Sequence, residues 1–125
     1  MSNDPYSART RELFAAPAHA GCPDGALSAT IEDQGVRIRL AAICAGDEIT
    51  ALGFEAWGCP HVIAAAEAFC ASYEHRPVVE LLDFSASDLM QSLSVPVEKA
   101  GRILVIEDAV RSLGSIVREA LDSKD

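Results

Sequence analysis

Residues 49–66 read ITALGFEAWGCPHVIAAA, and the spacing of their apolar side chains changes halfway along. Up to Trp57, the apolar residues Leu52 and Phe54 stand two positions apart and so lie on one face, which is typical of a half-buried strand. After Pro60, a residue that suits the first turn of a helix, small and branched apolar residues follow one another. The stretch therefore predicts a strand that passes directly into a helix packed closely on another element.

Two further strands are predicted upstream of this junction. Residues 27–32 and 36–40 alternate between apolar and polar side chains, as half-buried strands do. The turns at residues 33–35 and 45–48 are short enough to join antiparallel neighbours. A short helix over residues 6–14 precedes the strands. The N-terminal half is thus expected to form a helix and then a three-stranded antiparallel meander.

The sequence downstream of the junction predicts only helices. The first runs over residues 60–75, and two short ones follow over residues 77–84 and 85–93. Pro96 interrupts the pattern, and a last helix over residues 98–121 carries one apolar stripe. Strands followed by helices indicate an α+β fold rather than a parallel α/β sheet. We expect a three-stranded antiparallel β-meander packed against a C-terminal set of helices, with a short N-terminal helix.

The length of the chain predicts its domain organisation, and its net charge argues against several classes of binding partner. The 125 residues predict a single domain over residues 1–125, of which residues 1–4 are expected to be disordered. A formal net charge of −9 argues against nucleic acid and against an anionic membrane surface as partners. No apolar run reaches the roughly 20 residues that span a bilayer, and the N-terminus lacks the features of a secretory signal. We therefore expect a cytoplasmic protein whose four cysteines are reduced thiols.

Cys59 is the candidate reactive residue, because it stands where the strand enters the helix. Unpaired backbone N–H groups and the helix dipole favour a thiolate there, the form that binds metal, accepts sulfur or attacks. A small buried thiol at a tight junction is the equally open alternative. His61 is a possible second ligand or proton acceptor, although a surface or cap position is favoured. Cys44 and Cys70 are expected to be core thiols, and Cys22 to be exposed.

The sequence contains no catalytic set that can be assembled from its motifs. It has no Gly-rich phosphate loop, no GxSxG elbow and no HExxH. Glu107 and Asp108 are adjacent on the last helix and therefore face different sides of it. We predict a scaffold or binding protein rather than an enzyme.

Several segments match one protein family in the same order along the chain. The matching residues are Tyr6-Ser7, Leu13-Phe14 and residues 16–21 near the N-terminus, Phe54 and residues 57–59 and 63–66 at the junction, and residues 95–99 and 107–109 around the start of the last helix. Near the N-terminus, the family has a Tyr-Ser helix that ends in an aromatic residue, followed by Asn-Pro-Arg-Asn-Val-Gly. At the junction, it has a Phe-containing strand that leads into Tyr-Gly-Cys and a helix of small residues. Around the start of the last helix, it has Leu-Pro-Pro-Val-Lys and then Glu-Asp-Ala. The chain resembles the NifU N-terminal/IscU-type iron–sulfur cluster scaffolds over nearly its whole length.

The resemblance implies a ligand set, most of which this chain lacks. The family binds its cluster with three cysteines, helped by an aspartate near the first and a histidine before the third. Only the middle cysteine is present, as Cys59. The position of the first cysteine falls on Asp33, or within one residue of it if the turn is shifted, and the position of the aspartate falls on Gly35. The His-Cys pair falls on Gly101-Arg102, which places a cation that cannot bind iron where a ligand stood.

The site residues that follow from this alignment are few. Cys59 and Asp33 are expected to hold a cluster, and His61 to join them as a metal ligand, with Glu32 in reserve. Arg102 is expected to take the place of the metal, either by pairing with Asp33 or by holding the Cys59 thiolate.

Three functions remain open at this point. The first is an iron–sulfur cluster assembly scaffold that binds iron or a 2Fe–2S cluster weakly or transiently, because such a cluster normally needs four protein donors. The second is a ligand-depleted paralogue that acts as an interaction or regulatory partner of a cysteine desulfurase. The third is a persulfide carrier through Cys59. The expected partners are a cysteine desulfurase or other iron–sulfur assembly proteins, with Pro96 and Lys99 left from the family's chaperone-recognition segment as partner-binding residues.

Overall fold

The computed structural model describes residues 7–15 and 17–122, so the prediction for residues 1–4 lies outside the described residues. The elements are α1 (Ala8–Ala15), β1 (Leu27–Asp33), β2 (Val36–Ala45), β3 (Glu48–Trp57), α2 (Pro60–Tyr73), α3 (Val79–Leu82), α4 (Ser87–Ser92), the 3₁₀ turn η1 (Val97–Lys99) and α5 (Ala100–Asp122). Within these ranges, no helix combines the length and the apolar composition that a membrane-spanning segment needs.

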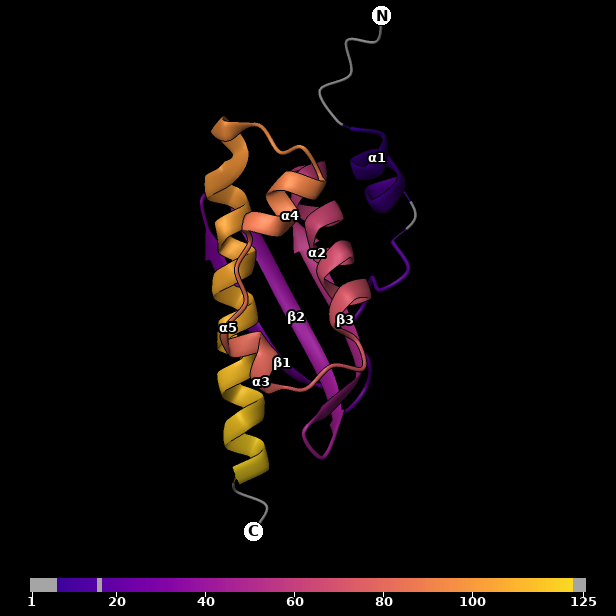
Figure 1. Ribbon diagram of the computed structural model, residues 1–125, viewed down its shortest axis with the longest axis vertical. Helices are drawn as coiled ribbons and strands as arrows, with labels where there is room; N and C mark the ends of the chain where they lie inside the picture. Colours follow the sequence, from indigo (N-terminus) through magenta and orange to yellow (C-terminus); the bar gives the residue numbers. More distant parts are fainter. Residues whose placement is uncertain (1–6, 16, 123–125) are drawn as a thin grey trace, which may run out of the picture.

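The strands form the predicted antiparallel meander in the order β1-β2-β3 (Figure 1). Ile31 faces Ile38 across β1 and β2, and Leu40 faces Phe54 across β2 and β3. Because side chains alternate between the two faces of a sheet, these partners give one face that is apolar across all three strands. β2 extends beyond its predicted end at residue 40, because residues 41–45 continue to pair with β3.

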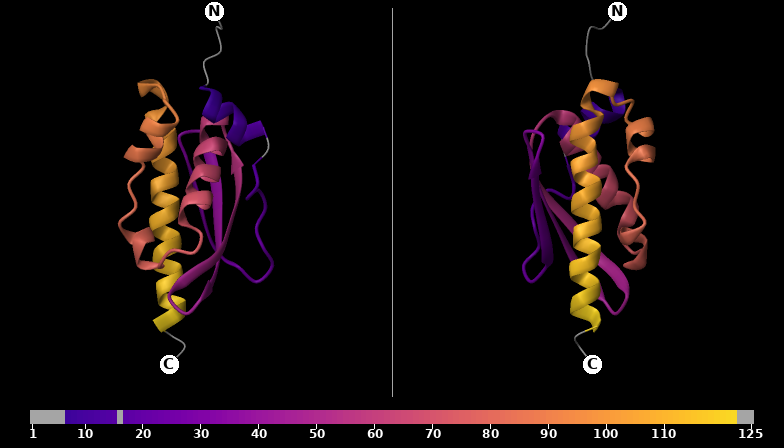
Figure 2. Two further views of the ribbon diagram at one scale, coloured as in Figure 1. Left: turned by 45° about the vertical axis from the view of Figure 1, so that its right-hand side comes forward. Right: turned by 90° about the vertical axis from the view of Figure 1, so that its left-hand side faces the viewer.

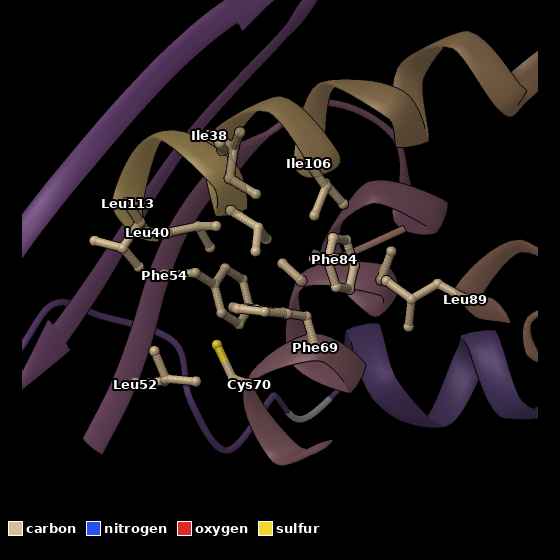
Figure 3. Packing of buried hydrophobic residues seen from close by; sticks show 14 of the residues in the cluster. Ile38, Leu40, Leu52, Phe54, Phe69, Cys70, Phe84, Leu89, Ile106 and Leu113 are labelled. Atoms are coloured by element: carbon tan, nitrogen blue, oxygen red, sulfur yellow. The ribbon is translucent and has the colours of Figure 1, made fainter. Parts of the chain in front are cut away.

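The helices α2 and α5 cover this apolar face, which confirms the α+β architecture (Figure 2). A run of buried alanines, residues 64–66, lets α2 lie close to the sheet. Phe69 of α2 stacks on Tyr73 with ring centroids 5.1 Å apart and meets Phe84 edge-on at 5.3 Å. Figure 3 shows Phe69 between Phe84 and the β3 side chain Phe54. The core therefore lies between the sheet and the helices, as the apolar stripes predict.

The opposite face of the sheet is covered in part by the loop between α1 and β1. A side chain on Gly53 would collide with the Gly21 carbonyl, and Ala41, the neighbour of Gly53 on β2, is fully buried. Elsewhere this face carries charged side chains, and Arg39 of β2 pairs there with Glu55 of β3 at 3.1 Å. The loop thus lies flat on β3 and β2, which only a glycine at position 53 permits.

The segment between α2 and α5 contains less helix than the sequence predicts. The two short helices, α3 and α4, are shorter than predicted, and the last helix begins at Ala100 rather than at Glu98. Pro96 adopts extended backbone, with φ −61° and ψ 149°, and the η1 turn separates it from α5. Proline lacks the N–H group that a helix interior needs, so α5 begins only after this turn.

Candidate functional site

Cys59 is the N-cap residue of α2, as the sequence predicts. Its backbone is extended, with φ −88° and ψ 165°, and Pro60 follows in the first helical turn. The Cys59 carbonyl accepts the N–H of Val62 at 2.9 Å. Its side chain is partly buried and, in this described part of the chain, makes no cap hydrogen bond. The thiol therefore stands at the positive end of a 14-residue helix without a capping role.

The turn between β1 and β2 lies beside this junction. A side chain on Gly58 would sit 3.3 Å from the Val36 side chain, and Val36 pairs with Asp33 at the end of the β1–β2 ladder. Asp33 is exposed, and its carboxylate accepts the N–H of Gln34 at 2.8 Å. Cys59 and Asp33 thus belong to adjoining segments.

The start of α5 reaches the same turn. A side chain on Gly101 would lie 4.0 Å from the side-chain oxygen of Gln34. Figure 1 shows that the first turn of α5 and the start of α2 lie at one end of the molecule. We call this the junction end, defined by residues 33–35, Gly58-Cys59 and Gly101-Arg102. The segments that the resemblance assigns to the ligand site therefore meet there.

Arg102 is half-buried in the first turn of α5. Within residues 7–15 and 17–122, no ion pair joins Arg102 to Asp33. The structure thus does not support pairing with Asp33 as the replacement for the metal. A role of Arg102 toward the Cys59 thiolate stays a prediction.

His61 is not at the surface, and the favoured surface or cap position is therefore wrong. Its side chain is 1% exposed, in the first turn of α2. Its assignment as a metal ligand stays a prediction that would require the ring to leave this buried position.

The described residues do not fit a metal centre made by one chain. Among residues 7–15 and 17–122, no group of three or more histidine, cysteine, aspartate and glutamate side chains is placed to hold a metal ion. A 2Fe–2S cluster normally takes four donors. Cys59 and Asp33 alone therefore fall short of a complete set.

The other cysteines are less suited to thiolate chemistry. Burial raises the pKa of Cys70 well above its ordinary value, and the carboxylates of Glu67 and Glu74 raise it further. Cys22 is half-buried rather than exposed, and burial and its hydrogen bond to Glu55 raise its pKa. Cys70 is a core thiol as predicted, whereas the exposure expected for Cys22 is wrong.

An exposed aromatic residue beside the junction end was missed by sequence reasoning. Trp57, two residues before Cys59, is 53% exposed, and the Arg37 guanidinium lies 5.1 Å from its ring centre. Val97, after Pro96, is 89% exposed. The signal for Trp57 was available, because its position in β3 has the opposite parity to the buried Leu52 and Phe54.

Comparison with known proteins shows the fold of the chain. No known sequence family and no curated protein matches it. The N-terminal domain of a nitrogen-fixing NifU-like protein from Brucella abortus matches with a TM-score of 0.71 and 15% identity, over 95% of each chain. A putative iron–sulfur cluster assembly scaffold protein for the SUF system from the thermophile Fervidobacterium islandicum AW-1 matches with a TM-score of 0.58 and 17% identity, over 84% of this chain and 81% of that one.

A third crystal structure, of a hypothetical protein, matches with a TM-score of 0.65 and 16% identity, over 83% of this chain and 95% of the other. At these identities the likeness establishes the fold. The chain has the fold of NifU-like and SUF-type scaffold proteins, as its motifs predict.

Proposed function

We propose that this protein acts in iron–sulfur cluster assembly as a scaffold-like protein that holds iron or a 2Fe–2S cluster weakly at Cys59. The observation that carries the proposal is the position of Cys59 at the start of α2, beside the turn that bears Asp33. The fold supports the same role, because two proteins that share it are a NifU-like protein and a putative cluster assembly scaffold. Binding of a cargo requires no independent enzyme activity.

The shortage of donors makes the proposed binding weak. Cys59 supplies one thiolate and Asp33 one carboxylate, and clusters prefer thiolates. The remaining donors would have to come from a partner protein or a second copy of the chain. Arg102 adds a fixed positive charge at the junction end, which disfavours a bare cation more than an anionic cluster.

Anaerobic reconstitution tests this proposal. The protein is incubated with ferrous iron and sulfide, desalted, and measured by visible absorption and by bound iron. We expect a weak absorption that the variant Cys59→Ser abolishes. The matched control Cys22→Ser, which changes a half-buried thiol on the other face of the sheet, is expected to retain it. A colourless wild-type protein without bound iron contradicts the proposal.

A second candidate function is sulfur acceptance from a cysteine desulfurase. It is favoured by the finding that the described residues offer no group of three donors, because a persulfide carrier needs a single thiol. The Cys59 thiolate would attack the outer sulfur of the desulfurase persulfide. The bond between the two enzyme sulfurs breaks, a new sulfur–sulfur bond forms on Cys59, and the desulfurase cysteine leaves as a thiolate.

Mass spectrometry distinguishes this candidate. After incubation with a desulfurase and cysteine, Cys59 is expected to carry one additional sulfur atom, and Cys59→Ser to carry none at any position. Binding to the desulfurase that survives in Cys59→Ser, with no sulfur transferred to wild type, would instead indicate an interaction partner. Sulfur on Cys22 with Cys59 unmodified would contradict the persulfide role.

A further inference from the structure

The loop between α1 and β1 contains a histidine held between two carboxylates. The ring Nδ1 of His19 contacts Glu67, and its Nε2 lies 2.9 Å from Glu74. Both carboxylates come from the same helical segment, Glu67 within α2 and Glu74 directly after it. Glu67 is only 4% exposed. The three side chains therefore form one ionic cluster at the border between α2 and the loop.

The two carboxylates beside the ring favour a His19 that carries a proton on both ring nitrogens. An ionised carboxylate is only an acceptor, so each nitrogen that contacts one must donate. Burial lowers the pKa of His19, but its hydrogen bonds to Glu74 and Glu67 and their charges outweigh this effect, and the pKa is raised above 6.5. The contacts and the charges thus both favour the imidazolium form of His19.

The same carboxylates bond to the backbone of the loop and of β3. The second oxygen of Glu67 accepts the N–H of His19 at 2.7 Å, and Glu74 accepts the N–H of Leu52 at 3.0 Å. The loop itself pairs with Phe54 of β3, whose N–H donates to the His19 carbonyl at 3.0 Å and whose carbonyl accepts from Gly21 at 2.7 Å. The ionic cluster therefore fixes the loop to the outer edge of β3.

We propose that His19, Glu67 and Glu74 form a proton-dependent latch, which holds residues 17–25 on the outer edge of β3 and releases them when His19 loses its proton. A neutral imidazole has one N–H and one lone pair. The lone pair would face a carboxylate oxygen, so one of the two contacts becomes repulsive. The loop then loses the ionic contact that positions its pairing with Phe54.

Two cysteines and a second histidine are the other titratable groups around the latch. On the helix, Cys70 lies near Glu67 and Glu74, and its raised pKa keeps it neutral. His75, after α2, helps to lower the pKa of Glu74 together with the Leu52 N–H and His19, against burial. In the loop, Cys22 is neutral for the reasons given above. The two cysteines therefore stay neutral over the range in which His19 loses its proton.

The direction of the pH dependence follows from these groups. His19 binds its proton more tightly in the folded chain, so its contribution is fully present below 6.5 and is lost as the pH rises through the raised pKa. Glu74 has a lowered pKa, so its contribution is present above 4.5 and is lost as the pH falls through that lowered pKa. The latch is therefore closed between pH 4.5 and pH 6.5, and it opens as the pH rises through the raised pKa of His19.

Release would uncover the part of β3 that the loop covers. Gly53 lies directly under Gly21. The amides of Leu52 and Phe54 donate to Glu74 and to the His19 carbonyl when the latch is closed. These groups therefore report on its state.

Amide hydrogen exchange followed by NMR tests the latch. Protection factors, relative to an unstructured chain at the same pH, are measured for Leu52, Phe54 and Gly21 at about pH 6 and about pH 8.5, on either side of an ordinary histidine pKa and its upward shift. In wild type we expect protection to fall at least about tenfold at the higher pH, as expected for loss of a charged hydrogen bond. In His19→Gln, this pH dependence should disappear.

The control variant is His75→Asn, which removes an exposed histidine near the same carboxylates. Asparagine tolerates the positive φ of 71° at this position, so the wild-type fall in protection should remain. Equal protection at both pH values in wild type would overturn the proposal, and so would a fall in His19→Gln as large as in wild type.

A second variant keeps the proposal testable should His19→Gln fail to fold. In Glu74→Gln one of the two carboxylates is neutral, so the midpoint of the His19 ring titration, followed by nitrogen shifts, should move down toward the ordinary value. An unchanged midpoint would overturn the assignment of Glu74 to the latch.

Discussion

The junction end and the edge of β3 use their polar side chains in opposite ways. At the edge, His19, Glu67 and Glu74 bond to one another and to the backbone, so each charge has a partner. At the junction end, Cys59 makes no cap bond, Asp33 accepts a hydrogen bond from the next residue in its turn, and the described residues show no pair between Asp33 and Arg102. Bonded groups contribute to stability, whereas groups left uncommitted are available to bind something else.

The largest effect is expected when a buried member of the latch is removed. Glu67→Ala leaves the His19 N–H and one ring nitrogen without their acceptor, and the free energy of unfolding should fall by about 3 kcal/mol. Urea denaturation measures this change. The matched control is Glu80→Ala, which removes an exposed partner of Arg76 at 3.6 Å and should cost no more than about 0.5 kcal/mol. Equal losses in both variants would mean that the latch is not a stabilising cluster.

A smaller loss is expected when the loop is pushed off β3. Gly53→Ala places a side chain against the Gly21 carbonyl, and the overpacking should cost about 2 kcal/mol. Thermal denaturation compares it with Gly101→Ala at the junction end, where the nearest atom to a new side chain lies 4.0 Å away. The second change should raise stability by about 0.5 kcal/mol, because alanine is the better helix former. A loss at position 101 would mean that the junction end is as tightly packed as the edge.

The pH dependence of stability separates the two regions further. The free energy of unfolding of wild type should decrease as the pH rises from about 6 to about 8.5, because the folded chain holds the His19 proton more tightly. The difference between wild type and His19→Gln isolates this contribution from other titrating groups. Asp33→Asn at the junction end should leave the slope unchanged. A slope that is the same in wild type and His19→Gln would contradict the contribution of His19.

Local patterns in the sequence predicted most of the fold. Alternation predicted the first two strands, and the spacing of Leu52 and Phe54 predicted the third. Gly58-Cys59-Pro60 predicted the position of Cys59 at the start of the helix, because turn and cap preferences act within a few residues. The ligand segments met at one end because strand order and the last helix brought them together. The resemblance also predicted the shared fold correctly.

Side-chain contacts between distant segments could not be predicted in the same way. His19 lies 48 and 55 residues from its two partners, and no periodicity links them. The burial of His61 depends on which side of α2 faces the sheet, which two residues of a helix start do not define. One signal was available for the latch, since Glu67 and Glu74 stand seven positions apart, which is close to two helical turns.

The smallest effect concerns Cys59 itself, and its sign is informative. Serine is a strong N-cap residue, because its hydroxyl accepts an N–H of the first turn, whereas the Cys59 side chain makes no such bond in this described part of the chain. Cys59→Ser should therefore raise the free energy of unfolding by about 0.5 to 1 kcal/mol. Cys59→Ala, the matched control, offers no acceptor and should not raise it.

A Cys59→Ser variant that is more stable than wild type would mean that cysteine is not the most stabilising N-cap residue at this position. Such a loss of stability is expected where a thiol is kept for its chemistry. Denaturation of the three proteins at one pH, below the range in which thiols ionise, measures the difference directly. If Cys59→Ser and Cys59→Ala are both less stable than wild type, the sulfur stabilises the fold by packing. Cys59 would then contribute to stability as the bonded side chains at the edge of β3 do, which contradicts the contrast drawn between the two regions.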